Sequence, residues 1–158
     1  MNLPTLVVIP TYNEASNVLA MIERVRTATP QVDLLIVDDN SPDGTAGLVE
    51  RAAASDSQIH LLLRPGKAGL GAAYRAGFSW ALERDYQVLV EMDADGSHQP
   101  EQLPRLLAAI DNADLVIGSR WVPGGAVINW PVSRKILSLG GNLYTRLCLG
   151  ISVRDATG

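Results

Sequence analysis

The chain has 158 residues, of which 47% are apolar and 19% are charged, and this composition is typical of a folded domain with its own core. Its formal net charge of −4 argues against a general nucleic-acid-binding protein. The single cysteine, Cys148, excludes an internal disulfide, and His60 and His98 are too few for a histidine-rich zinc site.

Short apolar runs alternate with helical patterns along the chain. Continuous apolar runs predict strands at residues 6–9, 34–37, 59–63, 88–92 and 115–117. Apolar residues at helical spacing predict helices at 18–25, from Ser41-Pro42 to residue 52, and at 71–83, 103–110 and 136–147. This alternation predicts an α/β fold, with a mostly parallel sheet covered by helices on both faces. In such sheets, ligands bind beyond the carboxyl ends of the strands.

The chain is predicted to form a single domain over residues 1–158, because it holds no internal repeat, low-complexity tract or linker. Its abrupt stop at Asp155-Ala156-Thr157-Gly158 favours a piece truncated at its C-terminus. The part from Leu115 onward has 5 Lys and Arg against one acidic residue, whereas the part before it has 8 against 16. A basic C-terminal part suits groups that hold phosphates or touch an anionic surface, although chance is the alternative.

Two carboxylates, Asp93 and Asp95, follow the predicted strand at 88–92. Extended backbone points both side chains to the same side, where like charges are costly unless a cation lies between them. Carboxylate oxygens suit Mg²⁺ or Mn²⁺, and either ion would keep positions open for the phosphates of a substrate. The alternative is a pair of solvated loop aspartates, since Asp-x-Asp alone is a weak motif.

Polar residues also follow the first two predicted strands. Tyr12 could stack on a base, Glu14 could accept hydrogen bonds from a base or ribose, and Asp39 could hold either group. Turn formation and helix capping are the alternatives for these segments, and for Asp38 and Asp43 the two interpretations stay equally open.

Basic residues supply candidates for phosphate contact. The segment from Arg64 to Gly71 fits no known phosphate-binding pattern and is predicted to be a tight turn, with Lys67 as a weak candidate. Arg120 and Arg134 could neutralise a diphosphate, because a guanidinium group suits bidentate contact with anions. Solvation at the surface is the alternative for both arginines.

Taken together, the motifs resemble a known family. The motifs that carry the resemblance occur in chain order as Val8-Ile9-Pro10-Thr11-Tyr12-Asn13-Glu14, Val37-Asp38-Asp39-Asn40-Ser41-Pro42-Asp43-Gly44-Thr45 and Met92-Asp93-Ala94-Asp95. They resemble the glycosyltransferase family 2 enzymes, whose nucleotide-sugar fold is called GT-A. Later motifs are similar to the dolichol- or polyprenol-phosphate mannose synthases: Gly118-Ser119-Arg120, Pro123-Gly124-Gly125, Asn129-Trp130-Pro131, Arg134 and Val153-Arg154-Asp155-Ala156-Thr157. The run from Gly96 to Glu101 resembles actinobacterial members.

The resemblance implies a role for each matching position. It implies that a guanosine site is lined by Pro10, Tyr12, Glu14, Val37 and Asp39. Asp93 and Asp95 would hold Mg²⁺ or Mn²⁺ on the donor diphosphate, and the backbone of Ala94 would lie near the ribose or phosphate. Arg120 and Arg134 would contact donor or acceptor phosphates.

The sequence departs from the family pattern at Ser97. Many relatives carry a glutamine metal ligand there, whereas the serine hydroxyl is shorter and a weaker ligand. Ser97 would bind the cation directly or through water, or the cation would have fewer protein ligands. Asp155 and Thr157 match a later family motif, but the residues that usually follow are missing.

The resemblance implies transfer of mannose from GDP-mannose to a polyprenyl monophosphate, with inversion at the sugar. It implies a cytoplasmic enzyme, peripheral at the cytoplasmic membrane face through its own contact, a membrane-anchoring partner or a fused domain. Two alternatives remain close to this hypothesis: another family 2 transferase that uses a UDP-sugar and a lipid phosphate, and a non-catalytic nucleotide-sugar-binding fragment. A phosphatase of the haloacid-dehalogenase type and a receiver domain fit less well, because their aspartates follow different strands.

Overall fold

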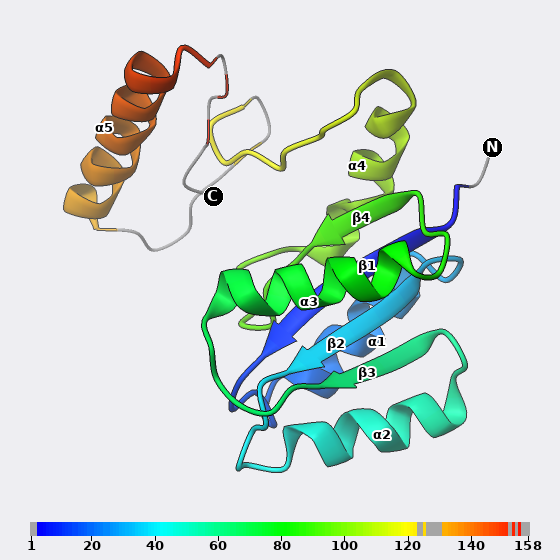
Figure 1. Cartoon of the computed structure of the whole chain (residues 1–158). Coiled ribbons are helices and arrows are strands. Elements are labelled where there is room, and N and C mark those ends of the chain that lie inside the picture. Colours follow the sequence, from blue (N-terminus) through cyan, green and yellow to red (C-terminus); the bar gives the residue numbers. More distant parts are fainter. Residues whose placement is uncertain (1–2, 123–124, 126–130, 152, 154, 156–158) are drawn as a thin grey trace. The chain divides into compact units, whose positions relative to one another are not determined.

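The computed structural model describes residues 3–122, 125, 131–151, 153 and 155 (Figure 1). Several residues of the family motifs lie outside the described residues: Pro123, Gly124, Asn129, Trp130, Arg154, Ala156 and Thr157. The chain divides into two compact units, residues 1–104 and residues 105–158, which we call the sheet unit and the C-terminal unit. Each unit is described by itself.

The sheet unit contains a parallel sheet with the strand order β3-β2-β1-β4. The strands are β1 (Thr5–Thr11), β2 (Asp33–Asp38), β3 (Ile59–Leu63) and β4 (Val88–Glu91). These match the first four predicted strands, because continuous apolar runs are typical of parallel strands buried on both faces.

The predicted strand at 115–117 is wrong. Residues 115–117 form no strand, and the side chains of Leu115 and Ile117 are 73% and 43% exposed. Three apolar residues satisfy the strand pattern, but a strand also needs a neighbour that accepts and donates its ladder hydrogen bonds. An apolar run of this length marks a strand only where both of its faces are buried, and this segment is exposed.

The predicted helices are all present, with shifted ends. Helices of the sheet unit are α1 (Val18–Ala28), α2 (Thr45–Ser55) and α3 (Leu70–Leu82), and the 3₁₀ helix η1 (Pro100–Gln102) leads into α4 (Leu103–Ala109). A second 3₁₀ helix, η2 (Ile110–Asn112), follows α4, and α5 spans Val132–Leu149. No helix among the described residues is long and apolar enough to cross a membrane.

The start of α2 differs from the prediction. Ser41 does not cap this helix, because α2 begins at Thr45, after Gly44 in a left-handed conformation with φ of +88°. The N–H and hydroxyl of Ser41 instead donate to the two carboxylate oxygens of Asp38, at 2.8 and 2.6 Å. A glycine supplies positive φ without a steric cost, so the turn ends there and the helix starts later.

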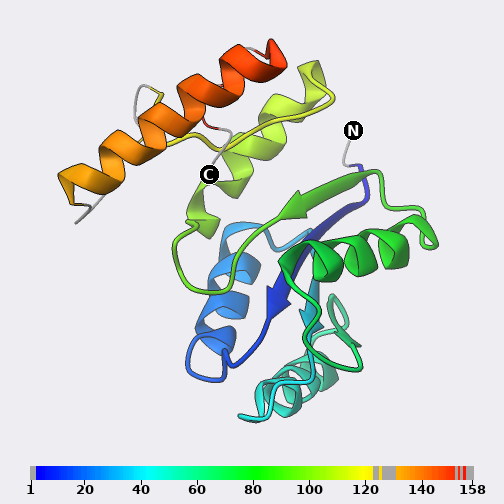
Figure 2. The same cartoon turned by 60° about the vertical axis from the view of Figure 1, so that its left-hand side comes forward.

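The sheet has its core on both faces. Leu6 and Val8 of β1 pack with α3, and the neighbouring residues Val7 and Ile9 are equally buried. Since successive side chains of a strand point to opposite faces, β1 contributes to two layers of core. Figures 1 and 2 show α1 and α3 on opposite faces of the sheet. The prediction of a parallel sheet covered on both faces is confirmed.

Helix α3 lies close to the sheet because of Gly77. A Cβ atom at this position would lie 2.5 Å from Cγ1 of Val8 and 3.3 Å from Cγ2 of Val37. The missing side chain therefore lets the helix approach β1 and β2 more closely than any other residue would allow.

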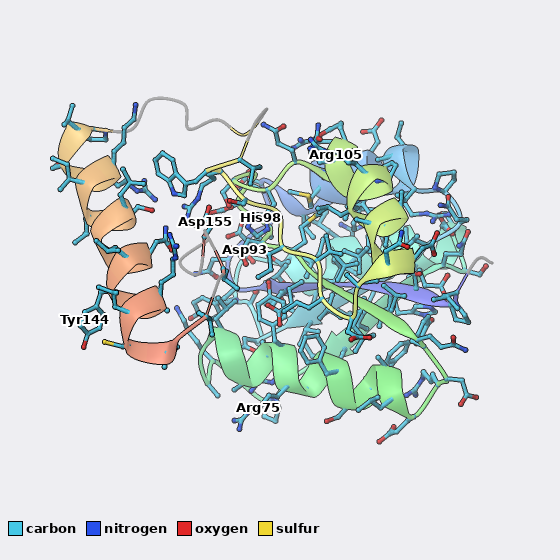
Figure 3. The ribbon with its side chains drawn as sticks, turned by 90° about the horizontal axis from the view of Figure 1, so that it is seen from above. Arg75, Asp93, His98, Arg105, Tyr144 and Asp155 are labelled. Carbon is cyan, nitrogen blue, oxygen red and sulfur yellow. The ribbon has the colours of Figure 1, made fainter. Side chains whose placement is uncertain are left out.

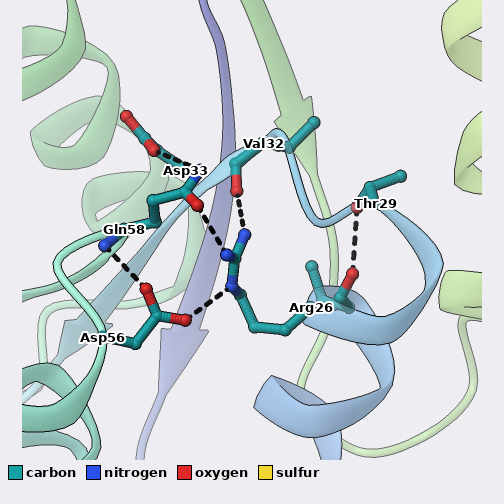
Figure 4. Close-up of polar contacts among 7 residues, drawn as sticks. Arg26, Thr29, Val32, Asp33, Asp56 and Gln58 are labelled. Carbon is teal, nitrogen blue, oxygen red and sulfur yellow. Dashed lines mark hydrogen bonds and ion pairs between the residues drawn. The ribbon is translucent and has the colours of Figure 1, made fainter.

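Arg26 of α1 forms a hydrogen-bond network at the amino end of the sheet (Figure 4). Its guanidinium donates to Asp56 Oδ2 at 2.8 Å, to the carbonyl of Val32 at 2.7 Å and to Gln58 Oε1 at 2.6 Å. The N–H of Gln58 and the Arg26 guanidinium hold the pKa of Asp56 below its usual value. This hydrogen-bond network occupies the amino ends of β2 and β3. A ligand site is therefore expected at the opposite, carboxyl ends of the strands.

Candidate functional site

The strand order places a crevice at the carboxyl ends of β1 and β4. The chain runs outward from β1 to β2 and β3, and then returns through α3 to place β4 on the other side of β1. The connections on the two sides of β1 therefore diverge, which is the usual place for a ligand in an open α/β sheet. A cavity of about 230 Å³ lies in the sheet unit, lined by Pro10, Thr11, Tyr12, Glu14, Asp39, Leu70, Ala73, Asp93, Ala94 and Asp95.

The cavity thus brings together seven of the predicted site residues from three separate segments: Pro10, Tyr12, Glu14, Asp39, Asp93, Ala94 and Asp95. Their segments meet because parallel strands end at one edge of the sheet. Val37 does not line this cavity. Its side chain is fully buried among the core residues under α3, so it can support the site only through packing or its main chain. The binding roles of all these residues remain predictions.

Asp93 is held by two neighbours. Its Oδ1 accepts a hydrogen bond from the hydroxyl of Tyr74 at 3.0 Å, and its main-chain N–H donates to Nδ1 of His98 at 3.0 Å. Figure 3 shows His98 beside Asp93, with Nε2 4.0 Å from Oδ2. Burial, and then the charge of Asp93, raises the pKa of Tyr74 well above its usual value. The Tyr74 hydroxyl therefore stays protonated and acts as a donor.

Asp95 is oriented by Ser97. The hydroxyl and the N–H of Ser97 both bond to this carboxylate, the N–H at 2.9 Å from Oδ1, and they lower the pKa of Asp95 below its usual value. Gly96 between them has a φ of +79°, which permits the tight turn. In this structure Ser97 acts on the second carboxylate, and it does not line the cavity. Its predicted role as a metal ligand remains a prediction.

The donor atoms at Asp93 and Asp95 fit a hard divalent cation. Both residues offer carboxylate oxygens, which suit Mg²⁺ or Mn²⁺ and not a thiophilic metal. Among the described residues, no group of three or more His, Cys, Asp or Glu side chains could hold a metal ion. A cation here would complete its coordination with water or with the oxygens of a phosphorylated ligand.

The cavity is also lined by Tyr12, which is 37% exposed. Nζ of Lys67 lies 4.1 Å from the centre of this ring, which is a cation–π contact. Glu14 Oε2 accepts from Asn17 Nδ2 at 2.8 Å, so its carboxylate is oriented within its own turn. An exposed aromatic face beside an oriented carboxylate can pack against a base and accept its N–H groups.

Asp39 is nearly buried and is paired with the segment that follows β3. One of its oxygens accepts from the guanidinium of Arg64, and the other accepts from the N–H of Ala68 at 3.2 Å. This segment therefore orients Asp39. The sequence did not predict a role at the site for Arg64, Tyr74 or His98. The position of Arg64 directly after a strand could have indicated such a role, whereas the sequence around Tyr74 and His98 gives no comparable indication.

Asp38 and Asp43 are explained by turn structure. The fully buried carboxylate of Asp38 accepts from the Thr11 hydroxyl at 2.8 Å as well as from Ser41. Asp43 accepts from the N–H of Ala15 at 3.0 Å and from the Thr45 hydroxyl at 2.6 Å, and these bonds lower its pKa. The bond from Thr11 joins the ends of β1 and β2, and the bond from Ala15 joins the segments that follow them, so both aspartates shape the site without needing a ligand.

Arg120 and Arg134 belong to the C-terminal unit. The Arg120 guanidinium donates to Asp155 Oδ2 and Oδ1 at 2.9 and 2.6 Å, and this pairing raises its pKa. Arg134 is exposed in the first turn of α5. The predicted contacts of both arginines with phosphates remain predictions.

Comparison with known proteins agrees with this architecture. The fold is that of GT-A glycosyltransferases. Residues 6–158 match the model of glycosyl transferase family 2. The chain belongs to that family.

Two curated relatives are particularly similar. The undecaprenyl-phosphate mannosyltransferase of Micrococcus luteus is 59% identical over 152 residues, covering 96% of this chain and 63% of the relative. The polyprenol monophosphomannose synthase of Mycolicibacterium smegmatis is 57% identical over 155 residues, covering 97% of this chain and 58% of the relative. The chain thus spans about three fifths of each relative. The resemblance to polyprenol-phosphate mannose synthases is confirmed.

A solved structure supports the fold alone. A mannosyltransferase from Pyrobaculum calidifontis, solved in complex with GDP-Man and Mn²⁺, superposes with a TM-score of 0.59 at 21% identity. The match covers 70% of this chain and 33% of that protein.

Proposed function

We propose that this chain carries the donor-binding part of an enzyme that transfers mannose from GDP-mannose to a polyprenyl monophosphate, with inversion, using Mg²⁺ or Mn²⁺. The observation that supports the proposal is a single cavity lined by Tyr12 and Asp39 and also by the carboxylate pair Asp93 and Asp95. A nucleoside needs an aromatic side chain and a hydrogen-bond acceptor, and a diphosphate needs carboxylates that bind its cation; the cavity contains both. The names of the two similar relatives, which act on undecaprenyl or polyprenol phosphate, supply the acceptor class.

In this proposal the protein positions the donor. Tyr12 packs against the guanine, and Asp39, fixed by Arg64, accepts hydrogen bonds from the nucleoside. Asp93 and Asp95 hold the cation, which when bound supplies positive charge to the departing diphosphate. Orientation of the donor for in-line attack and stabilisation of its leaving group then provide most of the rate enhancement.

The acceptor needs no strong general base. A polyprenyl monophosphate already has an anionic oxygen near neutral pH, whereas a sugar hydroxyl would have to lose a proton. Attack on the face opposite the α-linked nucleotide gives a β-mannosyl phosphate. Arg120 and Arg134 stay in the proposal as candidates for phosphate contact, on the chemistry of the guanidinium group.

The lipid acceptor implies contact with a membrane, and we propose a peripheral location at its cytoplasmic face. The excess of basic residues from Leu115 onward suits a surface that carries lipid phosphates. Sedimentation with vesicles containing a polyprenyl phosphate, compared with vesicles of neutral lipid, measures this contact.

The decisive test is calorimetric titration of the chain with GDP and with UDP, each with and without Mn²⁺. Binding of GDP that is at least about tenfold tighter than that of UDP, and that depends on Mn²⁺, is expected if base and diphosphate are both recognised. Tighter binding of UDP would mean that the donor is a UDP-sugar and not GDP-mannose. Absence of nucleotide binding, together with a trapped acyl phosphate on Asp93, would overturn the proposal in favour of a phosphatase.

A further inference from the structure

Tyr74 is the one aromatic side chain of α3 that reaches the carboxylate pair among the described residues. It lies on the helix that packs on the sheet, is only 9% exposed, and belongs to the core cluster with Val8 and Val37. Its ring also lies 6.1 Å from that of Phe78, centre to centre. The ring is therefore fixed by packing, and only the hydroxyl projects to a polar partner.

That polar partner is Asp93. The hydroxyl of Tyr74 donates to Oδ1 at 3.0 Å, while the main chain of Asp93 is anchored by its bond to His98. A carboxylate on a turn can rotate about two side-chain torsions, and each rotation moves its oxygens. One contact on the backbone and one on Oδ1 restrict both torsions, so the position of Oδ2 is determined as well.

We infer that Tyr74 is a positioning residue, whose hydroxyl holds the Asp93 carboxylate in the orientation that receives the divalent cation. The inference rests on the proposed function, since it needs a cation at this pair. Residues that hydrogen-bond to metal ligands commonly change metal affinity by about 10- to 100-fold, because a ligand that is already oriented loses less freedom on binding. Tyr74 acts through Asp93 and does not itself bind the metal.

The chain contains a matched control. The hydroxyl of Tyr86 donates to Oδ2 of Asp33 at 2.6 Å, and burial raises the pKa of Tyr86 as it does that of Tyr74. Asp33 begins β2 and therefore lies at the opposite end of the sheet from the cavity. Tyr86→Phe removes the same atom from the same kind of bond, without touching the carboxylate pair.

The experiment compares the wild-type chain with Tyr74→Phe and Tyr86→Phe. Binding of Mn²⁺ in the presence of GDP is measured by calorimetry and by electron paramagnetic resonance, and folding is checked by circular dichroism and thermal unfolding. Tyr74→Phe is expected to weaken Mn²⁺ binding by about tenfold and to alter the Mn²⁺ spectrum, while Tyr86→Phe leaves both unchanged. Each variant loses one part-buried hydrogen bond from a tyrosine to an aspartate. Equal Mn²⁺ affinity in the two variants would therefore overturn the inference.

A double variant tests whether Tyr74 acts through Asp93. In an Asp93→Asn background, Tyr74→Phe is expected to have little further effect on Mn²⁺ affinity, since the carboxylate that it orients is gone. A full and independent effect there would overturn the positioning role. Tyr74→Met removes the same hydroxyl and places a flexible apolar side chain in part of the space of the ring, and it serves if Tyr74→Phe does not fold.

Failure of the inference and failure of the proposed function give different results. If the wild type binds GDP and Mn²⁺ but Tyr74→Phe matches it, only the inference fails. If the wild type binds no Mn²⁺ at all, the metal assignment fails and the inference fails with it.

Discussion

Arg120 and Asp155 form a bidentate ion pair inside the C-terminal unit. Nε and Nη2 of the guanidinium donate at 2.9 and 2.6 Å, and the main-chain N–H of Arg120 donates to the same carboxylate at 2.9 Å. Asp155 is only 2% exposed, and Nδ2 of Asn142 from α5 lies 3.4 Å from its Oδ1. The pair links a segment after η2 to the end of the chain, so Arg120 has a structural role besides any contact with phosphate.

We expect Asp155→Asn to destabilise the C-terminal unit by about 2 to 3 kcal/mol, because it leaves the guanidinium of Arg120, which is only 24% exposed, without its charged partner. Urea unfolding followed by circular dichroism, with limited proteolysis to report on the C-terminal unit, measures the change. Glu101→Gln is the control: it also breaks a bidentate pair, with Arg24, but an exposed one, and it should cost less than about 1 kcal/mol. Equal losses in the two variants would contradict the structural role of the pair.

Stability should also depend on pH through Asp155. Hydrogen bonds from Arg120 hold the pKa of this carboxyl below its ordinary value of about 3.9. A depressed pKa in the folded state means that the contribution is complete above the ordinary value and is lost as the pH falls through the lower, folded value. Urea midpoints of wild type and Asp155→Asn should therefore converge as the pH falls below about 4. A constant difference down to the lowest pH would show that the ionised form is not what stabilises the unit.

Replacement of either carboxylate of the pair tests the metal assignment. Asp93→Ala and Asp95→Ala should each weaken Mn²⁺-dependent GDP binding by at least about 100-fold, because few protein ligands are available to share the loss. Binding of GDP without metal should change little. Titration of each variant with and without Mn²⁺ measures both quantities, and near-normal metal dependence in a folded variant would refute the assignment.

Gly77→Ala should change the stability of the protein through two opposing effects, helix propensity and steric overlap. Alanine is favoured over glycine inside a helix by up to about 1 kcal/mol. At Gly77, however, the new methyl group would meet Val8 at 2.5 Å, and overpacking of this kind costs about 1 to 3 kcal/mol. The clash should win, so the variant should be less stable in urea unfolding.

The control for Gly77 is Gly47 in α2. Its nearest neighbour to a new Cβ is Nη1 of Arg51 at 3.8 Å, which is ordinary contact with a flexible side chain. Gly47→Ala should therefore be neutral or stabilising. If both variants shifted the urea midpoint in the same direction, close packing of α3 on β1 would not be the cause.

Much of the fold could be predicted from the sequence because its signals are local. Strands β1 to β4 are continuous apolar runs, and α1 and α3 show helical spacing within single segments. The same property explains the error at Leu115 to Ile117, where an apolar run pairs with no strand in the described part of the chain. A pattern within one segment carries no information on whether a neighbour exists to complete its hydrogen bonds.

The apolar runs of the sequence were enough to predict the sheet. The polar residues that follow those runs were enough to predict the family and the candidate site residues Tyr12, Asp39, Asp93 and Asp95. Only the tertiary structure shows which side chains hydrogen-bond to these candidates and orient them. Tyr74 contacts Asp93 across 19 residues, Arg64 contacts Asp39 across 25, and Arg120 contacts Asp155 across 35. Such contacts depend on how closely helices and loops pack against strands. Gly77, which carries no charge and no motif, brings α3 close enough for Tyr74 to reach the carboxylate.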